Sequence, residues 1–119
     1  MDCIFCKIIN KEIPTEIVFE NDHVVAFKDI HPKAPTHILI VPRKHVESIN
    51  HLGSEDRDVI AEIILTAPKI AGMMKTKDGY KLAFNVGRKG GQIVDHLHMH
   101  LLAWPEDDKE AKRKEVAPI

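Results

Sequence analysis

The stretch DHLHMHLLAW, residues 95–104, constrains the fold more than any other part of the chain. Histidine occupies every second position at His96, His98 and His100, and the residues between them are Leu and Met. Side chains two residues apart share one face of a strand, whereas in an α-helix they point about 200° apart. The alternation therefore predicts a strand over residues 96–104, with clustered imidazoles on one face and apolar side chains on the core face.

Hydrophobic patterns predict four further strands and two helices. The strands are expected at residues 16–20, 23–29, 36–42 and 80–86, and the helices at residues 3–10 and from Ser54 to about residue 74. Ser54 is a candidate N-cap of the long helix, and Pro68 inside it is expected to cause a kink. The connections in the first half are hairpin-length and no βαβ alternation occurs. We therefore predict an α+β domain, with an antiparallel five-stranded sheet, one long helix and one short helix.

Composition narrows the classes of function. A chain of 119 residues with 44% hydrophobic and 29% charged residues is expected to form one globular domain. A net charge of −1 offers no basic face for nucleic acid, so no nucleic-acid partner is expected. No stretch approaches the roughly 18 apolar residues needed to cross a bilayer, and the first residues lack the pattern of a signal peptide. A cytoplasmic location without membrane contact is expected, and residues 105–119 are interpreted as a charged, solvated tail.

Apart from a disulfide, the two cysteines, Cys3 and Cys6, allow three interpretations: a redox motif, a metal site, or two incidental buried cysteines. A structural disulfide is disfavoured in a reducing compartment. A redox CxxC motif normally follows a strand within a βαβ unit, and no strand precedes this one. A tetrahedral metal site needs two more ligands, which histidines could supply. Two incidental buried cysteines are the third interpretation.

A glycine-rich loop directly precedes the alternating histidines. Gly87, Gly90 and Gly91 allow the backbone to approach a ligand and to direct amides at it, and Gln92 adds a side-chain amide. Such a loop alone could be a simple turn. Joined to three histidines, it indicates a phosphate site in which the imidazoles divide the roles of metal ligand, nucleophile and proton or anion partner. The competing interpretation is a half-exposed strand that uses histidine as its polar residue.

Three segments carry a resemblance to the histidine triad (HIT) family. They are CIFCKII, VVAFKDIHPKAPTHILIVPRKH and NVGRKGGQIVDHLHMHLL, and the similarity spans nearly all of residues 3–104. The sequence is most similar to the histidine triad nucleotide-binding branch, whose members hydrolyse purine nucleoside phosphoramidates. The resemblance implies a HIT-like fold in a domain of residues 1–104, a homodimer with a sheet continuous across the interface, and a purine nucleotide substrate.

The resemblance also implies the roles of individual residues. It assigns His98 as the nucleophile, which attacks the α-phosphate and forms a nucleotidyl-imidazole intermediate that water hydrolyses to AMP or GMP. His100 is placed beside the phosphate or the leaving group, and His37 is given proton delivery. The implied nucleotide-binding residues are Phe27 and Ile30 around the base, Asp29 on the ribose, Asn85 near the ribose and phosphate, and Gly91 and Gln92 on the phosphate.

Many bacterial members of the family carry CxxC at the N-terminus and bind zinc. The corresponding ligands in this chain are Cys3, Cys6, His45 and His96. Four protein ligands close the coordination shell, so this zinc, one per chain, is expected to be structural. No catalytic metal is expected.

The chain departs from the branch at three places. Ile93 stands where a serine often contacts the phosphate, and Asp95 stands where an aromatic or apolar residue is usual. The segment after Trp104 does not match the region that helps select the leaving group. A dinucleoside polyphosphate hydrolase and a nucleotide-dependent binding module are therefore retained as alternatives to a phosphoramidase.

Overall fold

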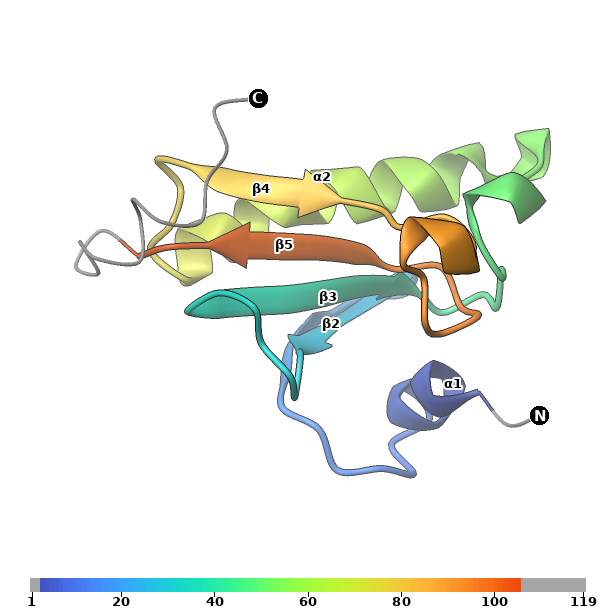
Figure 1. The fold of residues 1–119 in the computed structure, drawn as a ribbon, viewed down its shortest axis with the longest axis horizontal. Helices are drawn as coiled ribbons and strands as arrows, with labels where there is room; N and C mark the ends of the chain where they lie inside the picture. Colours follow the sequence, from blue (N-terminus) through green and yellow to red (C-terminus); the bar gives the residue numbers. More distant parts are fainter. Residues whose placement is uncertain (1–2, 106–119) are drawn as a thin grey trace.

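The computed structural model describes residues 3–105. Five antiparallel strands form one sheet in the order β1-β2-β3-β5-β4 (Figure 1). The strands are β1 (Ile17–Glu20), β2 (Val24–Lys28), β3 (Thr36–Pro42), β4 (Tyr80–Ala83) and β5 (Met99–Ala103), and the helices are α1 (Ile4–Ile9) and α2 (Arg57–Met73). The predicted fold class, an antiparallel α+β domain with one long and one short helix, is confirmed.

One face of the sheet packs on α2, which lies behind it in Figure 1. Met99 and Leu101 are fully buried there, together with Ile63 and Ile70 of the helix. Burying an aliphatic side chain of this size contributes about 1.5–3 kcal/mol, so this layer supplies much of the stability. The apolar half of the alternating stretch faces the core, as predicted.

The opposite face is partly covered by α1. Phe5 and Ile8 of this helix pack against Val25, Phe27 and Leu39 of the sheet. Strand β3 is therefore buried on both faces along its whole length, which agrees with its continuous apolar sequence. Because α1 is short, it does not cover the part of this face that carries the half-buried His100.

Several boundaries differ from the sequence-based prediction. Strand β5 begins at Met99, so His96 and His98 lie in an irregular segment before it. A 3-10 turn, Ser54–Asp56, precedes α2, whose N-cap is Asp56 rather than Ser54. The helix continues through Pro68. Apart from residue 105, the predicted tail lies outside the described residues.

No helix in the described part of the chain combines the length and hydrophobicity required to cross a membrane.

Candidate functional site

The sheet brings three of the predicted site histidines together. His37 lies on β3, His100 lies on β5, and His98 precedes β5 by one residue. His37 Nε2 is 2.9 Å from His100 Nδ1, and the rings of His98 and His100 have centroids 4.9 Å apart. The antiparallel pairing of β3 with β5 therefore joins residues that are 63 positions apart in sequence.

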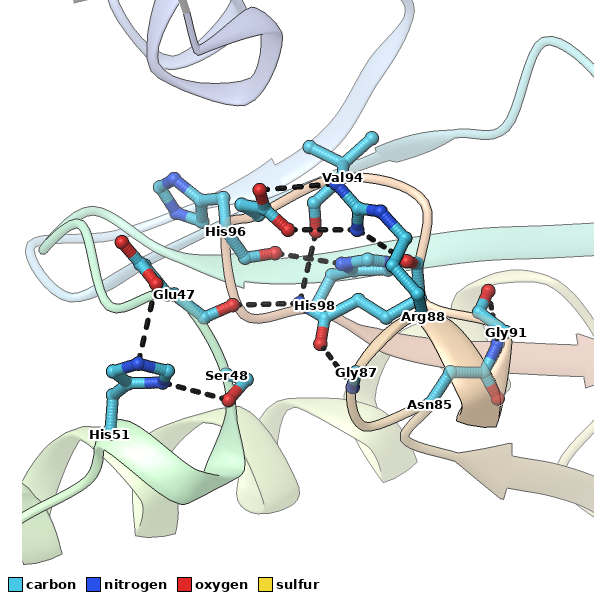
Figure 2. Close-up of polar contacts among 12 residues, drawn as sticks. Glu47, Ser48, His51, Asn85, Gly87, Arg88, Gly91, Val94, His96 and His98 are labelled. Carbon is cyan, nitrogen blue, oxygen red and sulfur yellow. Dashed lines mark hydrogen bonds and ion pairs between the residues drawn. The ribbon is translucent and has the colours of Figure 1, made fainter.

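The tautomer of His98 is set by one backbone contact. Its Nδ1 lies 2.8 Å from the carbonyl oxygen of His96, and a carbonyl can only accept (Figure 2). Nδ1 therefore carries the proton, and the lone pair of neutral His98 is on Nε2. Burial lowers the pKa of His98, although the His96 carbonyl and Asp29 oppose this effect. The ring is thus neutral near pH 7, as an imidazole nucleophile must be.

A directional hydrogen-bond chain connects the other two histidines. The backbone N–H of Lys33 donates to His37 Nδ1 at 3.1 Å, so the proton of neutral His37 is on Nε2. That Nε2–H donates to His100 Nδ1, and the proton of His100 is therefore on its own Nε2. His100 Nε2 is buried and has no hydrogen-bond partner among residues 3–105. An unpaired buried donor beside His98 is suited to an oxygen of a bound phosphate.

Burial keeps the two hydrogen-bonded histidines, His37 and His100, uncharged. It is the largest cause of the lowered pKa of His37, which the neighbouring Asp29 partly offsets. Burial, followed by the nearby His98 and His37, lowers the pKa of His100 from 6.5 to about 4. Both rings therefore act near pH 7 as neutral donors and acceptors.

Asp29, His37 and His100 also lie close enough to hold a metal ion, with their candidate ligand atoms within 4.8 Å of one another. The Lys33 N–H disfavours this role, because it requires a lone pair on His37 Nδ1 and hence a proton on the Nε2 that would face the ion. The contacts fit a hydrogen-bonded group better than a ligand set. Asp29 Oδ2 lies 3.5 Å from His37 Nε2, and its Oδ1 accepts the backbone N–H of His31 at 2.8 Å.

The glycine-rich loop has the backbone conformations that only glycine adopts readily. Gly87 and Gly91 have φ angles of 72° and 91°. Gln92 is buried inside the loop, where its Oε1 accepts the N–H of Gly87 and its Nε2 donates to the carbonyls of Glu47 and Val94 (Figure 2). These contacts use both amide hydrogens of Gln92, so its side chain holds the loop in shape. Asn85 Nδ2 reaches the Gly91 carbonyl at 3.5 Å.

The two apolar residues assigned to the base occupy different environments. Phe27 is 2% exposed and packs edge-to-face on Phe5, with ring centroids 5.4 Å apart. Ile30, in the loop after β2, is 77% exposed and available to a ligand. Ile93, which follows the glycine-rich loop, is 81% exposed. The structure thus presents two exposed isoleucines and one buried aromatic ring among these positions.

Asp95 pairs with Arg88 and has no contact with the His96 side chain among the described residues. The guanidinium contacts both carboxylate oxygens, at 2.8 and 3.1 Å, and donates to the Gln92 carbonyl at 2.6 Å. Both side chains of the ion pair are more than half exposed, so the pair contributes little to stability. Its effect is to connect the two ends of the loop.

The predicted metal ligands form a second cluster on the α1 side. Cys3, Cys6, His45 and His96 have all their candidate ligand atoms within 4.8 Å of one another. His96 Nδ1 lies 3.4 Å from Cys3 Sγ and 3.1 Å from His45 Nδ1, and Cys6 Sγ lies 3.3 Å from His45 Nδ1. Tetrahedral zinc with bonds of about 2.0–2.3 Å separates its ligands by about 3.3–3.8 Å. The three sulfur–nitrogen distances of 3.3, 3.4 and 3.6 Å fall in this range and the nitrogen–nitrogen distance is slightly shorter, so a small adjustment would accommodate such an ion.

The surroundings of the cluster support the same interpretation. His96 is fully buried, and its Nε2–H donates to the Pro42 carbonyl at 2.9 Å, which leaves Nδ1 free to face the other ligands. Cys3 caps α1, since its Sγ accepts the backbone N–H of Cys6 at 3.4 Å. A cavity of about 550 Å³ on the outer side is lined in part by Cys3, His45, Glu47 and Arg88. The cluster is therefore reachable through this cavity, whose lining includes two of its ligands, Cys3 and His45.

Three groups of the site are not predicted by the sequence patterns. The Lys33 amide and the His96 carbonyl act through the backbone, and every residue except proline carries the first of these groups. Phe5 contacts the His98 ring edge-to-face at a centroid distance of 5.0 Å, but in the sequence it is only one apolar residue of a short helix. A clue to its position was its place between the two cysteines.

Known proteins resemble this chain in both sequence and structure. The family model described as "Scavenger mRNA decapping enzyme C-term binding" matches residues 2–115. The chain is 43% identical to Protein HitA of Neisseria gonorrhoeae over 87% of this chain and 97% of that protein. It is 47% identical to the purine nucleoside phosphoramidase of Escherichia coli K12, over 85% of this chain and 86% of the relative.

A solved structure agrees with these sequence relatives. The HIT family hydrolase from Legionella pneumophila Philadelphia 1 superposes with a TM-score of 0.83 and 47% identity, covering 86% of this chain and 92% of that one. On the family model, the relatives and the fold, the chain belongs to the histidine triad family.

Proposed function

We propose that the chain is a hydrolase that releases a nucleoside 5′-monophosphate, AMP or GMP, from purine nucleoside phosphoramidates through a covalent nucleotidyl-histidine intermediate. The observation that carries this proposal is the buried, neutral His98, whose Nδ1–H is bonded to the His96 carbonyl and whose Nε2 lone pair is free. The Escherichia coli relative, 47% identical, is named a purine nucleoside phosphoramidase, which supports the choice of P–N bond and base.

The reaction proceeds in two displacements. In the first, His98 Nε2 attacks the α-phosphorus, the P–N bond to the leaving amine breaks, and the amine departs with a proton. In the second, water attacks the same phosphorus, the P–Nε2 bond breaks, and the neutral imidazole is restored as the water proton leaves. The His96 carbonyl serves both steps, because it accepts the Nδ1–H more strongly when the ring becomes cationic.

His100 stabilises the charge that develops on phosphorus oxygens. Its Nε2–H is the unpaired donor of the site, and His37 fixes the ring that carries it. Donors oriented before the reaction are effective because no reorganisation is needed in the transition state. His37 therefore acts through His100, and delivery of a proton to the amine falls to His100 or to water beside it.

The remaining predicted residues position the nucleotide. The Asp29 carboxylate accepts the ribose hydroxyls, the exposed Ile30 and the underlying Phe27 contact the base, and the backbone near Gly91 holds phosphate oxygens. Asn85 and Gln92 support this loop through their contacts with Gly91 and Gly87. With Ile93 in place of a serine, no side-chain hydroxyl is available at that position, so the phosphate depends on backbone amides.

We further propose one structural zinc per chain and a homodimer. Zinc at Cys3, Cys6, His45 and His96 would cross-link α1 to the sheet, and its four protein ligands leave no position for substrate. The dimer would form along β4, which pairs only with β5 and ends the sheet. Leu82 on this strand is 38% exposed, and Leu65 on α2 is 59% exposed, so a second copy could cover both.

The test follows AMP release from adenosine phosphoramidate and from AMP-lysine by wild-type and His98→Ala proteins. Loss of the nucleophile is expected to lower kcat/KM by several orders of magnitude, of the order of 10,000-fold. His23→Ala is the matched control, because His23 is an exposed histidine in the β1–β2 hairpin and should leave the rate unchanged.

Mass spectrometry of rapidly quenched wild-type protein should detect a nucleotidyl adduct on the peptide that carries His98. Equal rates for wild-type and His98→Ala proteins would refute the proposal. Faster turnover of diadenosine polyphosphates than of phosphoramidates would favour a dinucleoside polyphosphate hydrolase. Tight AMP binding with no turnover of either substrate would favour a binding module.

A further inference from the structure

The proposed nucleophile lies outside the regular part of the sheet. The β3–β5 ladder reaches only as far as the pair Ile40–Met99, one residue after His98. Beyond it, the backbone of residues 96–98 is held by a bond from Leu97 N–H to the Val46 carbonyl at 2.6 Å, the one backbone bond between this stretch and a neighbouring loop in the described part of the chain. The direction of the His98 ring therefore depends on how the residues around it are anchored.

His96 belongs to the metal cluster and to the catalytic site at once. Its side chain is fixed at both nitrogens, since Nδ1 faces Cys3, Cys6 and His45 and Nε2–H donates to the Pro42 carbonyl. Its backbone carbonyl accepts the Nδ1–H of His98. A ring held at both ends restrains the main chain next to it, so the cluster determines where this carbonyl points.

The two cysteines anchor a second contact with the same ring. Phe5 lies between Cys3 and Cys6 on α1 and is 6% exposed. Its ring meets His98 edge-to-face, with centroids 5.0 Å apart and planes at 88°, and meets His96 in the same manner at 5.9 Å. Holding both cysteines in place therefore also holds the Phe5 ring, against which His98 packs.

We propose that metal binding at Cys3, Cys6, His45 and His96 positions His98 for attack, through the His96 carbonyl and the Phe5 ring. This inference rests on the proposed function and assigns His96 and Phe5 as positioning residues. It differs from a purely structural role because it predicts that loss of the metal lowers the reaction rate but leaves nucleotide affinity almost unchanged. Ile30 and Asp29 lie in the loop between β2 and β3 and do not belong to the ligand cluster, so nucleotide affinity should survive loss of the metal.

The experiment compares zinc-loaded protein with protein treated with a chelator, which can enter through the cavity lined by Cys3 and His45. We expect metal removal to lower the single-turnover rate of AMP release about 10- to 100-fold, the loss that a small misplacement of a reacting group causes. The Kd for AMP should change less than about threefold. The rate should return when zinc is added back.

A spectroscopic measurement separates positioning from general damage. In ¹⁵N spectra of the imidazoles, zinc-loaded protein should show His98 as one tautomer with Nδ1–H, and metal-free protein should show exchange between tautomers. Ile9→Ala is the matched control, because it removes buried packing from α1 but keeps all four ligands. It should lower the unfolding midpoint and leave both the rate and the His98 signals of the folded protein unchanged.

Circular dichroism is recorded on every sample, so that rates refer to folded protein. If chelation unfolds the chain, the Cys6→Asp variant is used instead of the chelator. Its carboxylate is still a zinc ligand but binds more weakly, so zinc occupancy can be titrated. Rate and His98 tautomer should then follow zinc occupancy. Equal rates and identical His98 signals with and without zinc would overturn the inference. A zinc-loaded wild type that forms no nucleotidyl adduct would instead refute the proposed function.

Discussion

The three alternating histidines have three different sets of partners. His96 contacts the cysteines and His45, His98 donates to a backbone carbonyl, and His100 accepts from His37. Because the partners differ, substitutions at the three positions should have different effects: stability and positioning at His96, chemistry at His98, and charge stabilisation at His100. Imidazole suits all three tasks, since one ring can donate, accept or bind a metal according to its neighbours.

Replacement of His37 distinguishes a fixed donor from a proton carrier. Glutamine at this position places an amide N–H near the place of His37 Nε2 and can still donate to His100 Nδ1, but it cannot titrate. We expect His37→Gln to retain kcat within about 10-fold, and His37→Ala to lose about 100-fold, because it frees His100 to adopt the wrong tautomer. Steady-state kinetics with adenosine phosphoramidate measure both. Equal losses in the two variants would mean that His37 carries a proton.

His100 should make stability depend on pH. Its pKa is about 4 in the folded chain against an ordinary 6.5, chiefly because it is buried. Between these values the unfolded chain binds one more proton than the folded chain. The free energy of unfolding therefore keeps its full value above about pH 6.5 with respect to this residue and falls as the pH is lowered toward 4. After allowance for partial exposure, we expect a loss of about 2 kcal/mol from this residue.

Urea unfolding at pH 7 and pH 4.5 measures this loss. His100→Asn is the comparison, because its amide oxygen still accepts from His37 but the side chain does not titrate. The wild type should lose more stability than the variant between the two pH values. An identical decrease in both proteins would show that His100 does not contribute.

At the residue scale, the sequence predicts which groups take part but not how they are protonated. The alternation placed His98 and His100 on one face, the resemblance to the family added His37, and the structure brings the three within contact of one another. Their tautomers depend on the Lys33 amide and the His96 carbonyl, whose directions are decided by tertiary structure. Likewise, Gln92 has the right chemistry for a phosphate contact, but its burial commits the amide to the loop.

At the scale of elements, the prediction succeeded where one periodicity covered a whole segment. Strand β3 and helix α2 are long and regular, and their patterns identified them. The alternation of residues 96–104 overestimated β5, because His96 and His98 keep the spacing of a strand while the backbone has already left the ladder. The pattern records which side chains share a direction, but it cannot show which backbone groups find a partner strand.

The glycine-rich loop provides a prediction at this scale. Gly91 has φ of 91° and ψ of 11°, the left-handed conformation, in which a Cβ costs about 1–2 kcal/mol. Gly91→Ala should therefore lower the free energy of unfolding by about that amount. Gly90→Ala is the control, because Gly90 lies in the same turn without a positive φ, and an added Cβ there meets no atom within 4 Å. Urea denaturation of both variants checks the difference, and equal losses would contradict the explanation.

At the scale of the whole molecule, the sheet has one face against α2 and the other shared between α1 and the site. The continuous apolar sequence of β3 already indicated a buried strand. The strand order could not be predicted, because the position of β5 between β3 and β4 depends on contacts between distant parts of the chain. The metal cluster is a similar case, since Cys3 and His96 are 93 residues apart and only the resemblance to the family joined them beforehand.

The proposed dimer is tested by adding charge at the free edge of the sheet. Leu82→Arg on β4 should convert the dimer to a monomer, because a cation buried opposite its own copy is both desolvated and repelled. Ile30→Glu is the control, since it changes an exposed isoleucine in a loop at a different part of the sheet. Sedimentation velocity should show a dimer for the wild type and for this control. A Leu82→Arg protein that stays dimeric would place the interface elsewhere.

The position of β5 has a consequence for how the protein is made. Within residues 3–105 this strand is the last along the chain, yet β4 joins the rest of the sheet through it alone. A ribosome delivers β1, β2 and β3 early, and they can pair through short hairpins while translation continues. Strand β4 then has no partner strand, and Cys3, Cys6 and His45 still lack the fourth ligand, His96. The nascent chain therefore completes its sheet and its metal site in one late event, when the segment from His96 to Ala103 emerges.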